Sequence, residues 1–322
     1  MTVTEEPGAP GRDAAPQVRI VEVGPRDGLQ NEAARLPVDV KRELIERLAR
    51  AGLRDIEAGA FVSAKWVPQM ADSDALLRSL EALRGPGGPL AGVRLPVLTP
   101  NLQGFEAARA AGARDVAVFA SASETFSRRN VNCSVDESLK RFEPVLAAAA
   151  SAGIRVRGYL SCVAGCPYEG AVAPAAVAGV AGRLWALGCH EISLGDTIGV
   201  GTPGALLAML EAVARVVPVD RLAGHFHDTY GMGAVNAYAA YRFGIRVFDA
   251  SVAGLGGCPY APGAGGNVAT EDLVYLFHGL GAGTGADLQA LADAGDWICA
   301  RLGRPTRSRA GGALLAKRDA RI

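Results

Sequence analysis

The sequence predicts a parallel (β/α)8 barrel, the TIM-barrel fold, followed by a C-terminal helical extension. Short β-branched runs alternate with longer Ala/Leu-rich segments of helical period, and eight such strand-then-helix units occupy roughly 260 residues. Strands of a parallel barrel are buried on both faces and therefore form nearly continuous apolar runs. A doubly wound open sheet is the competing fold, but it would normally use five or six strands.

The eight predicted strands are 18–23, 55–59, 94–98, 115–120, 155–161, 191–195, 222–227 and 247–253. A helix candidate follows each strand within a few residues. Asp, Ser, Thr or Pro opens several of these helices, and a glycine closes four of them. The residues that open and close these helices therefore agree with the helical period of the sequence.

Composition divides the chain into three parts. Residues 1–16 are rich in Pro, Gly, Ala and acidic residues without an apolar period, so we expect a disordered tail. Residues 17–283 hold the barrel as the catalytic domain. Residues 284–322 begin with an amphipathic helix from about 287 to 302, and we expect a flexible Gly/Arg-rich tail, or one that packs on a partner subunit, after it.

The composition favours a protein whose partners are small molecules. The 322 residues are 49% hydrophobic with a formal net charge of zero, so nothing indicates binding to nucleic acid or to an anionic membrane. No apolar run approaches the ~18 residues of a membrane span, and the first residues lack a signal-peptide core. Six scattered cysteines fit a reducing compartment. We therefore expect a cytoplasmic protein.

Ionisable side chains gather where the predicted strands end. In a TIM barrel, the C-terminal ends of the strands and the loops after them form the active-site face. The residues there are Arg26 and Asp27 after the first strand, Glu57 on the second, Asp196 and Thr197 after the sixth, and His225, His227 and Asp228 at the seventh. Any one alone could be a solvated loop charge, but convergence from four strands indicates a site.

His225 and His227 form the most specific local pattern. A strand repeats every two residues, so both imidazoles project to the same side, close enough to share one ion. Asp27 adds a carboxylate, because ring closure places the seventh and first strands two apart around the mouth. This mixed ligation leaves open positions and suits Mg²⁺, Mn²⁺ or another divalent cation. A pair of buried structural histidines is the alternative.

Residues 251–272, SVAGLGGCPYAPGAGGNVATED, are too rich in Gly and Pro for a helix or strand, and we predict a long loop over the mouth. The loop holds one thiol, Cys258, and one amide, Asn267, which lies just before a predicted helix start. Both are placed to reach the metal region. An inert buried thiol is the alternative for Cys258. Cys162 and Cys166 lack a second pair at ligand spacing, so we predict no zinc site there.

Segments from about residue 18 to 305 resemble the 3-hydroxy-3-methylglutaryl-CoA lyases, a family of the DRE-TIM metallolyase superfamily. The segments are VEVGPRDGLQNE, FVSAKWVPQMAD, VNCSVDESLKRF, LSCVAGCPYEG, EISLGDTIGVGTPG, GHFHDTYG and SVAGLGGCPYAPGAGGNVATEDLVYL. Synthases of the same superfamily share the Arg-Asp and HxH framework. The cysteine-containing glycine-rich loop is typical of the lyases.

The resemblance implies a role for each residue of the site. The implied cation ligands are Asp27, His225, His227 and Asn267. Arg26 would face the thioester carbonyl, and Cys258 would serve in proton transfer. Glu57 and Asp196 occupy the family's other catalytic carboxylate positions. We expect Gln30 and Asn31 to shape the substrate site beside Arg26.

Two departures from the family pattern lie at the substrate end. Ala33 stands where a lysine is expected, and Gly59-Ala60 replaces a polar pair. Both departures bear on the acyl group and on the affinity for CoA rather than on the chemistry. Arg128 and Arg129 are candidates for contacts with the CoA phosphates.

The implied reaction is metal-assisted, retro-Claisen-type cleavage of 3-hydroxy-3-methylglutaryl-CoA to acetyl-CoA and acetoacetate. The alternatives are a lyase for a longer 3-hydroxy-3-alkylglutaryl-CoA and a related Claisen-type synthase. A barrel without catalytic activity is a further alternative, but it would have lost the polar residues at the strand ends, and that set is complete here. The expected partners are an acyl-CoA substrate and a second copy in a homodimer, because barrels with a helical appendage commonly pair.

Overall fold

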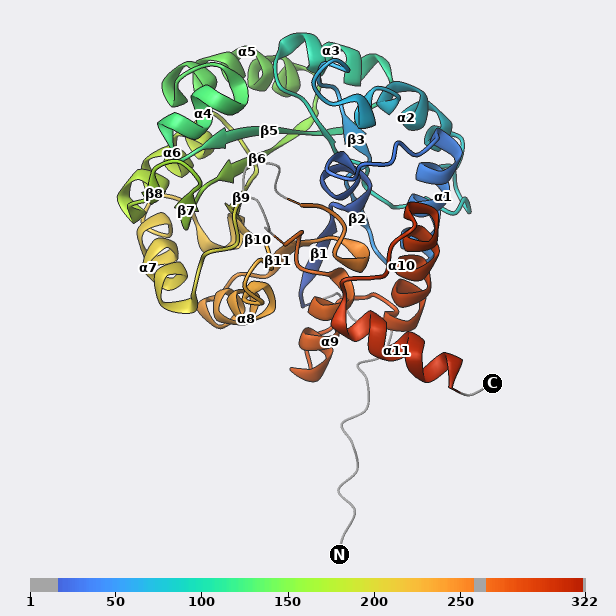
Figure 1. Cartoon of the computed structure of the whole chain (residues 1–322). Helices are drawn as coiled ribbons and strands as arrows, with labels where there is room; N and C mark the ends of the chain where they lie inside the picture. Colours follow the sequence, from blue (N-terminus) through green and yellow to red (C-terminus); the bar gives the residue numbers. More distant parts are fainter. Residues whose placement is uncertain (1–16, 258–264, 321–322) are drawn as a thin grey trace, which may run out of the picture.

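The computed structural model describes residues 17–257 and 265–320, which form a ring of parallel strands surrounded by helices (Figure 1). The hydrogen-bonded order of the strands is β2-β1-β11-β10-β9-β6-β5-β4-β3. The two strands at the ends of this order, β2 and β3, are successive parts of residues 55–60. One segment thus pairs with both edges of the sheet and closes the barrel. The predicted TIM-barrel fold is confirmed.

The barrel strands lie close to their predicted positions. They are β1 (Arg19–Glu22), β2 (Asp55–Ile56), β3 (Gly59–Ala60), β4 (Val97–Leu98), β5 (Asp115–Ser121), β6 (Arg155–Ser161), β9 (Glu191–Asp196), β10 (Leu222–Phe226) and β11 (Val247–Ala250). A small antiparallel hairpin, β7 (Gly165–Cys166) and β8 (Gly170–Ala171), follows β6.

Proline explains why two predicted strands are fragmented. Pro96 lies inside the predicted strand 94–98 and has no N–H to donate, so regular pairing begins only at Val97. The carbonyl of Pro96 still accepts from the N–H of Ala58 at 2.9 Å, between β2 and β3. The N–H of Glu57 donates to the carbonyl of Glu22 at 2.8 Å on the other side. The segment therefore stays in the wall of the barrel without forming a continuous strand.

The helices form the outer layer of the barrel in Figure 1. They are α1 (Val38–Arg50), α2 (Ser73–Glu81), α3 (Leu102–Ala110), α4 (Glu124–Val131), α5 (Val135–Ser151), α6 (Pro174–Ala186), α7 (Pro203–Val213), α8 (Gly233–Phe243), α9 (Thr270–Gly279), α10 (Leu288–Leu302) and α11 (Arg309–Asp319). Short helical turns are η1 (Gly24–Gly28), η2 (Pro68–Met70), η3 (Val219–Arg221) and η4 (Val252–Gly254). Within the described part of the chain, no helix is long and apolar enough to cross a membrane.

The predicted helix signals have a physical basis in the structure. Ser134 and Glu137 form a reciprocal capping box at the start of α5, which satisfies two free N–H groups. Gly52, after α1, has φ +99°, and a β-carbon there would lie 2.2 Å from the carbonyl oxygen of Gly285. Only glycine fits that close approach. Asp287 caps α10, whose range agrees with the predicted helix.

The barrel has an apolar outer layer and a polar interior. On β11, Phe248 is fully buried in the apolar layer, whereas Asp249 reaches Arg157 and Ser193 on other strands across the interior. Barrel interiors are usually filled by branched apolar side chains. Buried charges in this position must be paired, which makes the interior a place where side-chain geometry is tightly fixed.

Residues after α10 form the helix α11, so the expectation of a flexible tail is wrong for residues 309–319. Ser308 accepts from the N–H of Gly311 at 2.9 Å and caps the helix. Asp272 accepts from the Ser308 hydroxyl at 2.8 Å and from the N–H of Ala310 at 2.7 Å. Docking against α9 and α10 stabilises a segment whose glycines disfavour an isolated helix. The predicted tail at residues 1–16 lies outside the described residues.

Candidate active site

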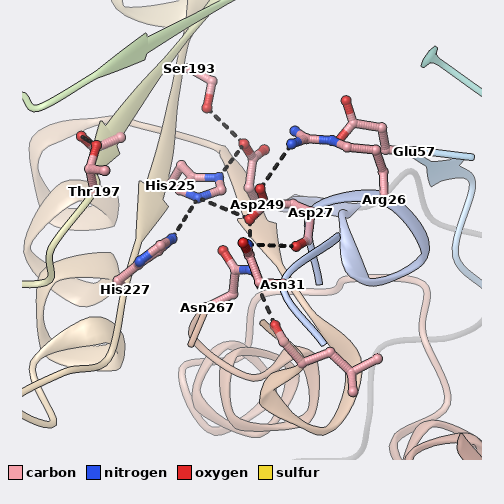
Figure 2. Close-up of polar contacts among 12 residues, drawn as sticks. Arg26, Asp27, Asn31, Glu57, Ser193, Thr197, His225, His227, Asp249 and Asn267 are labelled. Atoms are coloured by element: carbon pink, nitrogen blue, oxygen red, sulfur yellow. Dashed lines mark hydrogen bonds and ion pairs between the residues drawn. The ribbon is translucent and has the colours of Figure 1, made fainter. Parts of the chain in front are cut away.

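Arg26 and Asp27 lie on η1, a single π-helical turn that directly follows β1 at the C-terminal end of the barrel (Figure 2). The sequence predicted an irregular loop here. Gly28 is required by close packing, because a β-carbon there would lie 2.8 Å from atoms of both Ser251 and Leu255. The glycine thus brings the turn against residues 251–255, and places two charged side chains at the mouth.

Two imidazoles and one carboxylate meet at the mouth, as the sequence predicted. Nε2 of His225 lies 3.3 Å from Nε2 of His227 and 4.0 Å from Oδ2 of Asp27. A ligand atom from each of the three residues lies within 4.8 Å of the other two. Among residues 17–257 and 265–320, no other group of three His, Cys, Asp or Glu side chains comes this close. The arrangement is a possible metal site.

The state of the two histidines fits a cation. Burial, followed by the proximity of His225, lowers the pKa of His227 to about 4, so this imidazole is neutral near pH 7 and keeps a free lone pair. Nε2 of His225 faces the same gap, 3.3 Å from Nε2 of His227. A cation would satisfy both nitrogens and the Asp27 carboxylate together.

Asp249 orients His225 and was missed in the sequence prediction. Its Oδ2 lies 3.1 Å from Nδ1 of His225 and accepts from the Ser193 hydroxyl at 2.7 Å. Arg157 donates to both oxygens, at 3.0 and 2.7 Å. Burial raises the pKa of Asp249, but the Arg157 charge and the His225 contact hold that pKa well below its usual range. The only sequence signal was one charge in the otherwise apolar run VFDASVA.

The contact with Asp249 acts on the imidazole in turn. Burial lowers the pKa of His225, but the hydrogen bond and charge of Asp249 raise it above the ordinary value. With Nδ1 engaged by a carboxylate, Nε2 is left to face the Asp27 carboxylate. A carboxylate behind a histidine fixes the ring orientation in this way in many metal sites.

Arg26 is buried and held by two carboxylates. Its Nε donates to Oε2 of Glu57 at 2.7 Å, and its Nη1 donates to Oδ1 of Asp27 at 2.9 Å. The ring of Tyr159 lies 5.3 Å from the guanidinium carbon. Burial favours the neutral form, but the charges of Glu57 and Asp27 outweigh it and raise the pKa of Arg26. The guanidinium therefore stays charged in a site with little water.

Glu57 has one oxygen left over. The side chain is fully buried, and its Oε1 has no hydrogen-bond partner among the described residues. Burial raises the pKa of Glu57, although the neighbouring Arg26 charge opposes the shift. An unsatisfied carboxylate oxygen is costly in a protein interior, so its presence beside Arg26 indicates a functional role.

The polar residues predicted around Asp27 also lie beside it. Nδ2 of Asn267 donates to Oδ2 of Asp27 at 2.9 Å, and Nδ2 of Asn31 donates to the backbone carbonyl of Asp27 at 3.2 Å. Burial raises the pKa of Asp27, but the charge of Arg26, the two histidines and the Asn267 amide lower it overall. Gln30 is half-buried at the end of the same turn. Asp27 is therefore a carboxylate held in one orientation.

Asp196 and Asp228 are engaged by backbone rather than by the cluster. Oδ2 of Asp196 accepts from the N–H of Gly201 at 2.8 Å, and its Oδ1 accepts from the N–H of Val200 at 3.2 Å. Asp228 accepts from the N–H of Gly233 and caps α8. These contacts hold the loops after β9 and β10. A catalytic role for Asp196 stays a prediction.

Part of the predicted mouth loop falls outside the described residues, and Cys258 with it. Of the remainder, residues 252–254 form the helical turn η4, so the prediction of a loop is wrong there. Helix α9 begins at Thr270, three residues after Asn267, as the sequence predicted. Arg128 forms an ion pair with Glu124, and Arg129 stacks on Tyr168 at 4.3 Å.

The two departures from the family pattern lie in different surroundings. Ala33 is exposed after η1. Gly59 is buried, and a β-carbon there would lie 2.7 Å from the hydroxyl oxygen of Ser73. That hydroxyl accepts from the N–H of Ala60 at 3.1 Å, at the start of α2. Close packing of α2 therefore accounts for the glycine at position 59.

A TIM barrel with two histidines, a carboxylate and a buried arginine at its C-terminal face has the architecture of a metal-dependent enzyme. The match to a family model is more specific. The chain belongs to the HMGL-like family, whose model matches residues 17–298.

Relatives of this chain carry lyase names. A protein from Pseudomonas mevalonii named hydroxymethylglutaryl-CoA lyase is 62% identical over 300 residues, which is 93% of this chain and 97% of the relative. A Pseudomonas aeruginosa protein named 3-hydroxy-3-isohexenylglutaryl-CoA/hydroxy-methylglutaryl-CoA lyase is 58% identical, over 94% and 98% of the two chains. The crystal structure of hydroxymethylglutaryl-CoA lyase from P. aeruginosa superposes with a TM-score of 0.89 at 59% identity, covering 93% and 98%.

Proposed function

We propose that this chain cleaves 3-hydroxy-3-methylglutaryl-CoA to acetyl-CoA and acetoacetate. Membership of the HMGL-like family and the lyase names of relatives across nearly the whole chain support this activity. The observation that carries the proposal is the meeting of Asp27, His225 and His227 beside the buried Arg26. A β-hydroxy thioester could be held there at its hydroxyl and at its carbonyl.

A divalent cation, Mg²⁺ or Mn²⁺, would be held by Asp27, His225 and His227, with the side-chain oxygen of Asn267 as a further ligand. When bound, such a cation favours ionisation of the C3 hydroxyl and fixes the orientation of the substrate. Mixed nitrogen and oxygen ligation supports this choice of ions. Asp249 would keep His225 in the ligating orientation.

Arg26 would stabilise the charge that develops when the C2–C3 bond breaks. The electron pair of that bond moves to C2 and onto the thioester oxygen, while C3 becomes the ketone carbon of acetoacetate. Glu57 and Tyr159 hold the guanidinium in place before the reaction, so little reorganisation is needed. A preorganised donor of this kind contributes about 3 kcal/mol or more.

The proton of the C3 hydroxyl requires an acceptor, and we assign that role to Glu57. Its Oε1 is buried and has no partner in the part of the chain that the structure describes, whereas both oxygens of Asp196 accept backbone N–H groups. Burial raises the pKa of Glu57, which makes its carboxylate a stronger base. Asp196 would act by holding the loop after β9.

The enolate carbon of acetyl-CoA must be protonated, and Cys258 is the proposed donor. The thiol proton would move to C2 and complete the methyl group, leaving a thiolate that later regains a proton from solvent. Support comes from the resemblance of its glycine-rich segment to the lyases, since residue 258 itself lies outside the described residues. Gly256 and Gly257 precede it, and glycine permits a close approach.

A lyase for a longer 3-hydroxy-3-alkylglutaryl-CoA is the second candidate. The P. aeruginosa relative, whose name includes the isohexenyl substrate, favours this possibility. Small residues at Gly59 and Ala60 are consistent with a wider acyl site, although the packing of α2 also explains the glycine. Activity with both substrates would support a dual lyase.

The proposed function is tested with purified protein and 3-hydroxy-3-methylglutaryl-CoA, with and without EDTA. We expect release of acetyl-CoA and acetoacetate in equal amounts, loss of activity on chelation, and its return with Mg²⁺ or Mn²⁺. A longer 3-hydroxy-3-alkylglutaryl-CoA serves as the second substrate. Absence of cleavage in the presence of either cation would refute the lyase, and full activity in metal-free protein would refute the cation.

A further inference from the structure

Residues between α10 and α11 reach back toward the candidate active site. Nη2 of Arg304 donates to Oε1 of Glu32 at 2.7 Å. The N–H of Arg307 donates to the carbonyl of Ala253 at 3.0 Å, and its Nη1 donates to the carbonyl of Gly256 at 2.7 Å. The C-terminal extension thus contacts two segments that are far apart in the sequence, one after η1 and one after β11.

Ala253 is held in an unusual conformation. Its φ is +56°, a region that residues with a side chain rarely adopt. Both oxygens of the buried Glu271 accept from its N–H at 3.0 Å, and Arg307 donates to its carbonyl. Such strain persists only where the surroundings fix the backbone. Arg307 therefore provides part of the support that holds η4.

The supported segment packs directly on the candidate metal site. The carbonyl of Leu255 accepts from Nδ2 of Asn267 at 3.2 Å, and that amide also donates to Asp27. Gly256 has φ +115°, and a β-carbon there would lie 2.9 Å from Nδ2 of Asn267. A shift of residues 255–256 would therefore move Asn267 and disturb Asp27.

Glu32 joins the two walls of the site. Its Oε1 accepts from Arg304 and, at 3.4 Å, from the N–H of Gly256. The side chains of Arg304 and Glu32 are 17% and 13% exposed, so their ion pair is weakly screened by water. Glu32 follows Asp27 by five residues in the segment that continues η1.

From these contacts we propose that the C-terminal extension is a positioning element of the active site. Arg304 and Arg307 hold Glu32 and residues 253–256, and through them Asp27 and Asn267, in the arrangement that binds a cation. A test of this proposal by enzymatic activity rests on the proposed function, whereas a test by cation binding does not.

The test is titration of the full-length protein with Mn²⁺ alone, together with steady-state kinetics on 3-hydroxy-3-methylglutaryl-CoA. We expect Arg304→Met to weaken Mn²⁺ binding about tenfold and to lower kcat by a similar factor, with a smaller change in KM. Arg304→Lys should recover part of both losses, because an ammonium can still pair with Glu32. Arg301→Met is the matched control, since Arg301 is exposed and stacks on Trp297 of its own helix.

A double-mutant cycle separates positioning from general destabilisation. Glu32→Gln removes the same ion pair with little change of shape, and the double variant should lose no more Mn²⁺ affinity than either single variant. If Arg304→Met does not fold, Glu32→Gln decides alone. Mn²⁺ affinity equal to that of the wild type in folded variants would overturn the inference. Mn²⁺ binding without cleavage in the wild type would refute only the proposed function.

Discussion

The two ends of the barrel interior use buried charge in different ways. Near the N-terminal ends of the strands, opposite charges pair in series, and Asp55 alone contacts Arg94 at 2.5 Å and Arg19 at 3.5 Å. At the C-terminal end, one oxygen of Glu57 has no hydrogen-bond partner within residues 17–257 and 265–320, and two imidazole nitrogens face each other. Paired charges stabilise the closed ring, whereas unsatisfied atoms indicate where a ligand belongs.

Arg157 and Asp249 connect the two ends. Arg157 donates to Glu191 at 2.7 Å on one side and to Asp249 on the other, and Asp249 contacts His225. The stabilising network and the candidate metal site are therefore parts of one chain of contacts. The comparison predicts that charges at the mouth matter for chemistry and that charges at the opposite end matter for stability.

The largest effect is expected for Asp27→Ala, which removes a proposed cation ligand. Mn²⁺ binding should be lost, and kcat/KM should fall by about 1,000-fold or more, because a bound cation contributes several kcal/mol to such a reaction. Asp55→Asn at the opposite end is the control, and should lower the melting temperature while Mn²⁺ affinity is kept. Equal losses of Mn²⁺ affinity in the two variants would contradict the comparison.

Arg26→Gln should lower kcat by about 100-fold or more, because it removes the donor to the developing enolate oxygen. Asp27, the two histidines and Asn267 are all retained, so Mn²⁺ affinity should change little. The measurement is kcat on the acyl-CoA substrate beside a Mn²⁺ titration of the same preparation. An unchanged kcat would remove the proposed role of Arg26.

Asp249→Asn tests the contact that joins the two ends. The variant keeps the shape of the side chain but loses the charge that holds Arg157 and orients His225, so we expect Mn²⁺ affinity to fall about tenfold. Ser193→Ala, which removes only the hydroxyl contact to Asp249, should have a smaller effect. A wild-type affinity in Asp249→Asn would show that His225 needs no such support.

The smallest predicted effect is a pH dependence of stability from two glutamates buried behind the mouth. Burial raises the pKa of Glu22 to about 7 and that of Glu271 to about 8, despite hydrogen bonds that lower both. The folded chain thus binds these protons more tightly than the unfolded chain. This contribution to stability is complete below the ordinary pKa of 4.5 and is lost as pH rises through 7 and 8.

Glu22→Gln checks this expectation, because the amide cannot ionise yet can still accept from the N–H groups of Gly24 and Val252. The melting temperature should fall less steeply between about pH 4.5 and 7 in the variant than in the wild type. Parallel curves for the two proteins would exclude Glu22 as a source of the pH dependence.

The architecture was accessible from the sequence because it rests on short-range patterns. Apolar strands, helical periods and glycine stops each depend on a few neighbouring residues. The three members of the metal cluster were found because the order of strands in a barrel fixes which strand ends meet. His225 and His227 needed only the two-residue period of a strand.

Features that depend on distant contacts were missed. Helix α11 forms because Asp272 and α10 dock it, and no local pattern in its Gly-rich sequence shows this. Asp249 is recognisable as a partner of His225 only when the register of β10 and β11 is known, because it places the two residues side by side. The engagement of Asp196 by the backbone of residues 200–201 depends on a loop conformation that residue types do not encode.

The central claim is that a cation is bound by side chains from β10, from the residue that follows it, and from the turn after β1. Crystals grown with Mn²⁺ and measured at the manganese absorption edge test it most directly. The account predicts one anomalous peak, in contact with Nε2 of His225, Nε2 of His227 and a carboxylate oxygen of Asp27. A peak elsewhere, or no peak between these three residues at a Mn²⁺ concentration that supports activity, would contradict it.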